Sequence, residues 1–284
     1  MPASTPKPQT IRPGDVLLHM GDGEISKLIA WASNSRYSHS ALVLDDATLI
    51  EATGAGVKTK PLAPRLTNHQ EFSLIDAWRF GGVDAQLSAA RLAALQDSAR
   101  SFIGTPYPLN QLFELGIVCA LRDKLAWPEP LKWLLRIALD QVVRSDPGQM
   151  VCSEFIYRSF ADAKTEPPGA LRPVIEVVAT TQLPFPDIDW IALYEEYEQA
   201  RQASPHTLPA APLRASAAPS PAVPATVDPE HAALARQIRQ MRRAARTPIA
   251  GIAEIVDPWP NPETVTPEDF ATSPSFALAS HILS

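Results

Sequence analysis

A cysteine, a histidine and a glutamate in this chain stand where they could form an activated thiol nucleophile. Cys152 opens a helix-like run directly after the helix-breaking stretch 145–148. A thiol in the first turn of a helix faces unpaired backbone N–H groups and the positive end of the helix dipole, which both stabilise the thiolate. The position of Cys152 therefore indicates a nucleophile, the alternative being a small buried hydrophobic residue.

A thiol hydrolase also needs an imidazole beside the sulfur and a polar group that holds the other imidazole nitrogen. His39 opens a predicted strand at residues 40–44, and Glu51 ends the next strand. If these strands pair as a hairpin, His39 and Glu51 fall near the same end of neighbouring strands, where their side chains can touch. Taken singly, each residue has an ordinary structural interpretation, so the prediction depends on all three.

Other chemistries find less support in the sequence. Five further histidines show no metal-ligand spacing with one another or with either cysteine, so we expect no metal and no cofactor. They are His19, His69, His206, His231 and His281. The stretch 21–23 lacks the lysine of a phosphate-binding loop. Cys119 lies in an apolar run and is expected to be inert core, and no disulfide is expected.

The pattern of apolar residues predicts an α+β fold in which an antiparallel sheet packs against helices. Strands are predicted at residues 15–18, 40–44, 48–52, 57–60 and 72–78. Helices are predicted at residues 25–33, 85–102, 109–125, 131–143, from 152, and at 189–202.

The composition changes sharply after residue 202. Residues 203–228 are mainly Ala, Pro, Ser and Thr, which cannot bury enough apolar surface to fold, so they are predicted to be a linker. Residues 229–246 follow as a predicted helix. The final stretch carries several large apolar residues, and we expect part of it to dock on the core. The predicted organisation is a domain at 11–202, a linker at 203–228 and a C-terminal helical segment at 229–284.

The charge and the hydropathy of the chain limit the functions and cellular locations that we expect for it. A net charge of −6 argues against nucleic-acid binding, and the basic cluster at 236–246 is interpreted as a solvated helix face. The polar N-terminus resembles no signal peptide, and charges at 122–124 interrupt the longest apolar run. We therefore expect a protein without a transmembrane segment that is cytoplasmic as synthesised.

Several short motifs, in order, resemble the permuted papain-like amidases of the YiiX/YaeF group, which are relatives of the NlpC-type cell-wall peptidases. They are Pro13-Gly14-Asp15-Val16-Leu17-Leu18, Ser35-Arg36-Tyr37-Ser38-His39-Ser40-Ala41-Leu42-Val43, Ile50-Glu51-Ala52 with Gly56-Val57, Gly104-Thr105-Pro106-Tyr107 and Cys152-Ser153-Glu154. The resemblance covers roughly residues 11–163. It implies a circularly permuted papain-like fold in which the histidine precedes the cysteine.

The same resemblance implies a role for each matching residue. Cys152 would be the nucleophile, His39 the general base and later acid, and Glu51 the residue that orients His39. Tyr107 would lie beside the thiolate and donate its hydroxyl toward the oxyanion, the alternative being a packed turn aromatic. The chain departs from the family at Pro108, where relatives often carry Asp, which leaves local substrate contacts open. Glu154 is expected to be structural.

The resulting functional hypothesis is a cysteine hydrolase that cleaves an amide bond through a thioester, with a cell-wall peptide or an N-acyl amide as substrate. Residues 109–143 could cap the cleft and contact a lipid or membrane surface, or be ordinary core helices. One alternative is a thioester-mediated acyltransferase acting on lipids. Another is a non-catalytic binding or scaffold module, with residues 203–284 engaging a protein partner. A cell-wall target would require export, for instance as a secreted effector.

Overall fold

The computed structural model describes residues 11–108, 150–176, 183–203, 256–257, 262 and 265–283. The core of the fold is a six-stranded sheet in the order β4-β3-β2-β1-β5-β8, in which each neighbouring pair is antiparallel. Its strands are β1 (Val16–Gly21), β2 (His39–Val43), β3 (Thr48–Thr53), β4 (Gly56–Pro61), β5 (Phe72–Phe80) and β8 (Phe276–Leu283). A second, two-stranded sheet pairs β6 (Ile175–Glu176) with β7 (Val256–Asp257).

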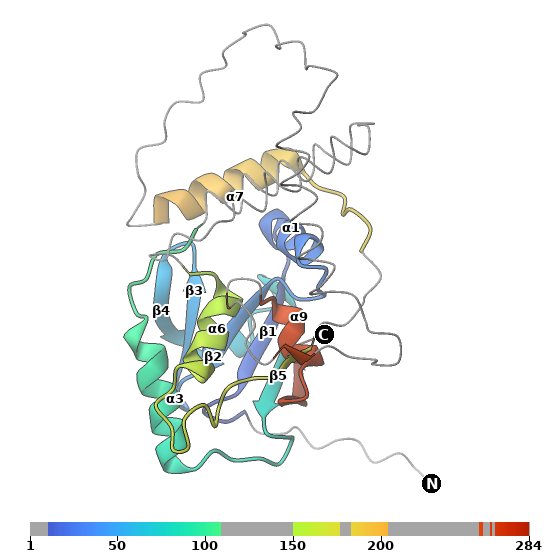
Figure 1. Ribbon diagram of the computed structural model, residues 1–284. Helices are drawn as coiled ribbons and strands as arrows, with labels where there is room; N and C mark the ends of the chain where they lie inside the picture. The colour runs from blue at the N-terminus through green and yellow to red at the C-terminus, as the bar shows by residue number, and fades with distance from the viewer. Residues whose placement is uncertain are drawn as a thin grey trace, which may run out of the picture.

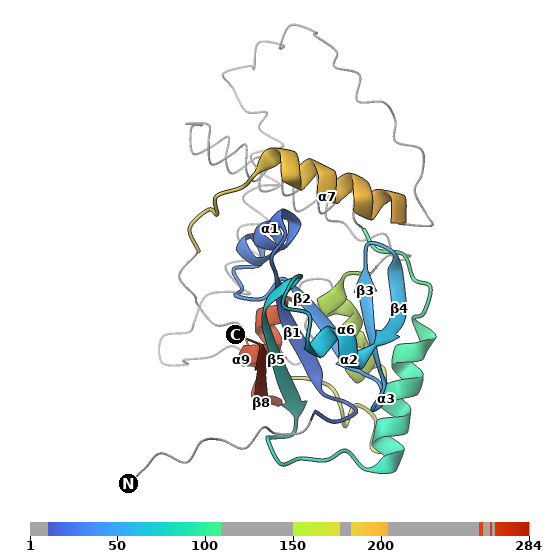
Figure 2. The same ribbon diagram turned by 180° about the vertical axis from the view of Figure 1, so that it is seen from behind.

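Helices lie on both faces of the large sheet. They are α1 (Glu24–Ala32), α2 (Leu62–Leu66), α3 (Ala89–Ser101), α6 (Cys152–Ala161), α7 (Trp190–Ala203) and α9 (Pro267–Thr272). Figure 1 shows α6, α3 and α9 on the face turned to the viewer, and Figure 2 shows α2 on the opposite face. The predicted α+β class, with an antiparallel sheet packed against helices, is confirmed.

Side chains along each strand point alternately to the two faces of the sheet, and each face has its own buried core. Leu18, Leu42 and Ile50 point to the face covered by α6 and share a buried core with Phe155 and Phe160 of that helix. A smaller buried cluster fills the opposite face, under α2. Its members are Leu17, Ala41, Val43, Leu49, Leu62 and Ala77. Because strands alternate their side chains with a period of two, neighbouring residues of β2 face different cores.

The predicted hairpin between β2 and β3 is confirmed. The carboxylate of Asp45 accepts hydrogen bonds from the N–H groups of Ala47 and Thr48, at 2.9 and 2.8 Å, and so closes the turn. The register pairs Ala41 with Glu51. Asp45 thus acts as a turn residue of the kind that hydrogen-bonds its own backbone.

Some predicted boundaries shift. The helix predicted at 85–102 begins at Ala89, because the hydroxyl of Ser88 accepts a hydrogen bond from the N–H of Arg91 and caps the helix there. The short helix α2 was not predicted. The predicted helices at 109–125, 131–143 and 229–246 lie outside the described residues, as do Cys119 and all but the first residue of the predicted linker at 203–228.

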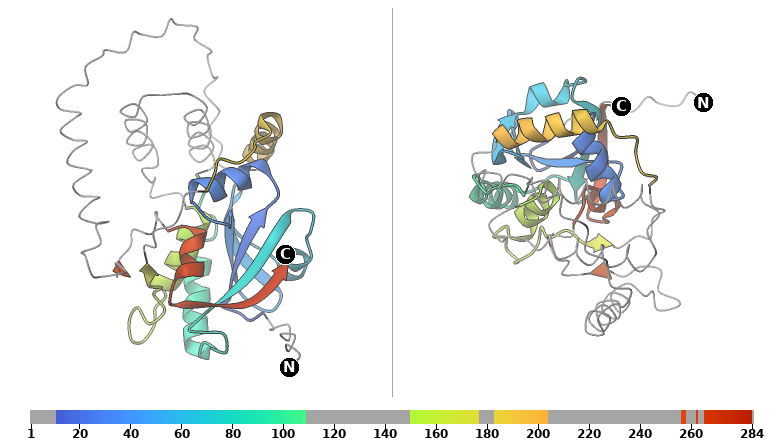
Figure 3. Two further views of the ribbon diagram at one scale, coloured as in Figure 1. Left: turned by 90° about the vertical axis from the view of Figure 1, so that its right-hand side faces the viewer. Right: turned by 90° about the horizontal axis from the view of Figure 1, so that it is seen from above.

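The end of the chain packs on the core as a short helix and an edge strand. Strand β8 pairs with β5 along its length, from Phe80↔Phe276 to Ile75↔Leu283, and lies beside it in Figure 3. Phe270 of α9 and Phe276 are buried, and both belong to the core under α6. The sequence predicted an apolar docking segment here but not its strand.

Helix α7 is anchored to the first turn of α1. The carboxylate of Glu196 accepts hydrogen bonds from the N–H groups of Glu24 and Ile25, at 2.8 and 3.0 Å. These donors are the unpaired N–H groups of the first turn, so a residue of α7 supplies the cap of α1. Among the described residues, no helix combines the length and the apolar character needed to cross a membrane.

Candidate active site

The start of β2 and the middle of β3 bring His39 and Glu51 together. His39 is the first residue of β2, and its Nε2 lies 2.8 Å from Oε2 of Glu51. The glutamate side chain is 1% exposed and the histidine side chain 18% exposed, so this contact is largely shielded from water. The hairpin therefore fixes one side of the imidazole ring and leaves its other nitrogen free to act elsewhere.

A second cation holds the other oxygen of Glu51. Nη2 of Arg65, in α2, donates to Oε1 of Glu51 at 2.8 Å. The guanidinium of Arg65 also lies over the ring of Phe72, 4.8 Å from its centroid. A buried carboxylate is costly unless it is paired and hydrogen-bonded, and Glu51 meets both conditions. Sequence analysis missed Arg65, since no motif links α2 to the hairpin.

Cys152 is the first residue of α6, as predicted, and it lies against the imidazole of His39. Cys152 is a free cysteine and 4% exposed, and the nearby His39 side chain lowers the pKa of its thiol. The helix N-cap is Val151, which has no side-chain acceptor for the first N–H groups of α6. Those N–H groups and the helix dipole face the sulfur, which favours its anionic form.

The charges of these three residues follow from their contacts. Burial alone would lower the pKa of His39, but hydrogen bonds to Cys152 and Glu51 raise it to about 9. Burial alone would raise the pKa of Glu51, but the hydrogen bond and charge of His39, with the charge of Arg65, lower it to about 2. Burial likewise opposes ionisation of Cys152, yet His39 and Ser40 lower the pKa of its thiol below the ordinary value. The arrangement therefore favours a thiolate and imidazolium pair.

Tyr107 reaches the sulfur from a loop that is hydrogen-bonded on both sides. Thr105 O accepts from Val57 N at 2.9 Å, and Pro106 O accepts from Met150 N at 2.9 Å. The second bond ties the loop to the residues just before Cys152. Burial, followed by the charge and hydrogen bond of Cys152, raises the pKa of Tyr107 well above its ordinary value. Tyr107 therefore remains a neutral O–H donor beside the sulfur.

Two further residues next to the imidazole were not identified as site residues from the sequence. His19 pairs with His39 across β1 and β2, and their ring centroids are 5.5 Å apart. Among the described residues, no partner makes a regular hydrogen bond to either ring nitrogen of the fully buried His19. Burial, then the charges of His39 and Arg65, lowers the pKa of His19 well below its ordinary value, so this ring is neutral. The second such residue is Ser40, which follows His39 on β2 and lowers the pKa of the Cys152 thiol.

Glu154 lies away from this chemistry. Its carboxylate pairs with Nε of Arg158 at 2.9 Å along α6. The neighbouring Ser153 turns toward the end of the chain, and its hydroxyl donates to Val265 O at 2.6 Å. The C-terminal segment thus contacts the residue that follows the cysteine.

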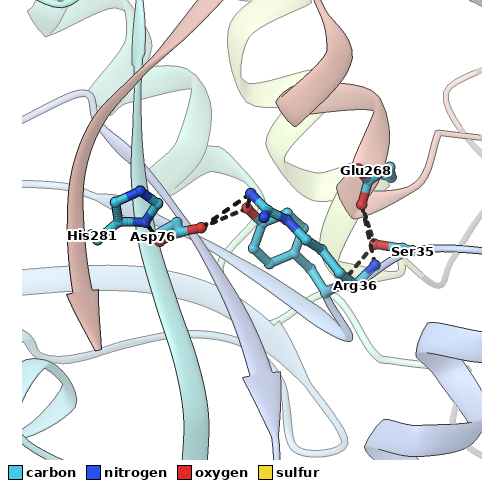
Figure 4. Close-up of polar contacts among 6 residues, drawn as sticks. Ser35, Arg36, Asp76, Glu268 and His281 are labelled. Carbon is cyan, nitrogen blue, oxygen red and sulfur yellow. Dashed lines mark hydrogen bonds and ion pairs between the residues drawn. The ribbon is translucent and has the colours of Figure 1, made fainter. Parts of the chain in front are cut away.

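A separate polar network joins the C-terminal segment to the loop before His39 (Figure 4). Oδ2 of the fully buried Asp76 accepts a hydrogen bond from the Tyr37 hydroxyl at 2.7 Å and pairs with Nη2 of Arg36 at 3.3 Å. Oδ1 of Asp76 lies 2.7 Å from Nδ1 of His281, which belongs to β8. One buried carboxylate therefore connects strand β8 with residues 36 and 37.

Helix α9 contacts the same loop. The carboxylate of Glu268 accepts hydrogen bonds from the hydroxyl of Ser35, at 3.1 Å, and from the N–H of Arg36, at 3.2 Å. The hydroxyl of Ser35 in turn accepts from the N–H of Tyr37 at 2.8 Å. The loop that delivers His39 to the site is consequently held by residues from the far end of the chain, as Figure 4 shows.

Within the residues that the structure describes, no group of three or more His, Cys, Asp or Glu side chains is placed to hold a metal ion. No family model matches the sequence, and no curated protein matches it either. Among solved structures, the chain is similar to one described as the crystal structure of the metalloprotein YiiX from Escherichia coli O157:H7. The two chains are 15% identical with a TM-score of 0.44, and the match covers 96% of this chain and 98% of the other.

Proposed function

We propose that this protein is a cysteine hydrolase that cleaves amide bonds through a thioester, on a circularly permuted papain-like fold. The observation that carries the proposal is the position of the His39 imidazole. Its Nε2 is held 2.8 Å from Glu51, while the same side chain lies beside a cysteine at the start of a helix and shares in the pKa shifts of that pair. A nucleophile, a base and a residue that orients the base are the parts that thiol hydrolysis requires.

In the proposed acylation step, the Cys152 thiolate attacks the amide carbon, and the carbonyl π electrons move to the oxygen. The Cys152 N–H and the Tyr107 hydroxyl are suited to stabilise that oxyanion. When the tetrahedral intermediate collapses, the C–N bond breaks and the His39 imidazolium gives its proton to the leaving amine. Glu51 keeps the ring oriented and favours its cationic form.

Deacylation uses the same residues in reverse roles. Neutral His39 removes a proton from water, the resulting hydroxide attacks the thioester carbon, and the C–S bond breaks. The sulfur departs as a thiolate and the carboxylic acid is released, which restores the starting pair. An amine or alcohol in place of water would give acyl transfer by the same steps.

The substrate classes that we propose are a cell-wall peptide and an N-acyl amino acid. The purified protein is incubated with peptidoglycan fragments and, separately, with N-acyl amino acids, and new free amines are quantified. We expect amine release from one class, which the Cys152→Ala variant abolishes. Glu154→Gln serves as a matched control, because Glu154 lies on the same helix but pairs with Arg158. Equal release by wild type and Cys152→Ala, or release from neither class, contradicts the proposal. Products formed with an added amine acceptor distinguish transfer from hydrolysis.

A further inference from the structure

Ser40 carries a buried hydroxyl that the proposed mechanism does not use. The residue is 0% exposed, and its Oγ has no regular hydrogen-bond partner in the described part of the chain. Buried side-chain hydroxyls nearly always have a partner, because an unpaired one has lost its hydrogen bonds to water without replacement. An unpaired hydroxyl beside an active site therefore calls for a specific reason.

The position of Ser40 in the sheet directs its polar groups toward Cys152. Ser40 follows His39 on β2 and shares the side of Leu42, the side on which α6 packs. The pairing of β2 with β3 ends at Ala41↔Glu51, so Ser40 lies one residue beyond the ladder. Both its backbone N–H and its hydroxyl are near enough to the Cys152 thiol to lower its pKa, although the hydroxyl makes no regular hydrogen bond to the sulfur.

We propose that Ser40 is a further catalytic residue, whose hydroxyl and backbone N–H donate to the Cys152 sulfur and hold it as a thiolate. Cys152 is 4% exposed, so these donors take the place of water around the anion. Hydrogen bonds to charged groups are stronger than those between neutral groups. The Ser40 hydroxyl therefore stabilises the thiolate more than the thiol.

Ser40 transfers no proton in this scheme. As the Cys152 sulfur attacks, its lone pair becomes the C–S bond, the negative charge moves to the substrate oxygen, and the Ser40 donors lose their acceptor. They regain it when the thioester is hydrolysed and the thiolate leaves. The proposal deepens the proposed function, and it can be tested on the thiol alone, without a substrate.

The test is the pH dependence of Cys152 alkylation by iodoacetamide, with peptide mapping by mass spectrometry to separate labelling at Cys152 from labelling at Cys119. In Ser40→Ala, which keeps the backbone N–H, we expect the midpoint to rise by about one pH unit. This means about tenfold slower labelling below the wild-type midpoint, since a tenfold change in equilibrium corresponds to one pKa unit. Ser40→Thr keeps the hydroxyl and should retain the wild-type midpoint.

Ser159→Ala is the matched control, because Ser159 is also a fully buried serine but donates to Phe155 O, at 2.7 Å, within α6. Its midpoint should equal that of wild type, and thermal unfolding confirms that each variant is folded. An unchanged midpoint in Ser40→Ala, or an equal rise in Ser159→Ala, overturns the role of Ser40. Amide cleavage by the wild type is scored separately, so that proposal can fail while the effect of Ser40 stands, and the reverse.

Discussion

Replacing Glu51 with Gln should lower the pKa of His39 and narrow the pH range in which the site is active. The substitution keeps the shape of the side chain but removes the negative charge 2.8 Å from Nε2 of His39. An opposite charge at this distance typically moves a pKa by about 1–3 units. The pKa of His39, about 9 in the folded protein, should therefore fall by about that amount in Glu51→Gln.

The same substitution should weaken the fold in a defined pH window. Because the pKa of His39 is raised from its ordinary 6.5, its pairing stabilises the fold fully below that value and is lost as pH rises through about 9. The pKa of Glu51 is lowered from 4.5 to about 2, so its contribution is present above 4.5 and disappears as pH falls through about 2. The free energy of unfolding lost in Glu51→Gln should thus be largest between pH 4.5 and 6.5. Removing one partner of a buried pair costs about 3–5 kcal/mol, and the isosteric amide should keep the loss near the lower figure.

Two measurements check this prediction. The pH profile of kcat/KM, or of Cys152 alkylation, gives the upper limit set by loss of the imidazolium, and urea unfolding across pH gives the stability difference. Glu154→Gln is the control, because this glutamate is also buried but pairs with Arg158. The reasoning is refuted if the upper limit in Glu51→Gln coincides with that of wild type, or if the Glu154→Gln control shifts it equally.

Three further substitutions test separate parts of the site. In His39→Ala, alkylation of Cys152 at mildly acidic pH should be lost, because the cation that lowers the thiol pKa is gone; labelling equal to wild type would contradict the pairing. Tyr107→Phe should reduce kcat about 100-fold with little change in KM, as expected for loss of one oxyanion donor, and steady-state kinetics that show only a KM effect would assign Tyr107 to packing. Asp76→Asn should lower the free energy of unfolding by about 1–3 kcal/mol, because Asp76 is fully buried. Asp97→Asn, at a side chain 83% exposed, should change it by less than about 0.5 kcal/mol, and equal losses in the two would refute the burial argument.

Local signals were sufficient to predict the hairpin and the helix of the candidate site. Asp45 lies between two apolar runs, and its carboxylate does close the turn through Ala47 and Thr48. Alternation along the strands fixes which residues share a face, so the approach of His39 to Glu51 followed from the hairpin alone. Cys152 begins α6 because the residues before it do not favour a helix and those after it do.

The missed residues depend on contacts that leave no local signal. Arg65 reaches Glu51 from a short helix whose orientation is set by burial of Leu62 under the sheet. His19 reaches His39 only through the register of β1 with β2. Strand β8 joins the sheet at β5, and the sequence between them gives no indication of that pairing. Sequence patterns predict elements well, but they do not specify which distant elements pair.

The C-terminal segment helps to position the candidate site as well as to complete the sheet. The loop at residues 35–37 leads directly into His39, and its polar groups bond to Asp76 of β5 and Glu268 of α9. Asp76 is in turn paired with His281 of β8. A loop held by the buried carboxylate of Asp76 and the partly buried carboxylate of Glu268 has few alternative conformations, which limits the freedom of the imidazole at its end. The order of these segments in the chain matters less than the sheet and core that bring them together, because the nucleophile and its base meet only where α6 packs on β2.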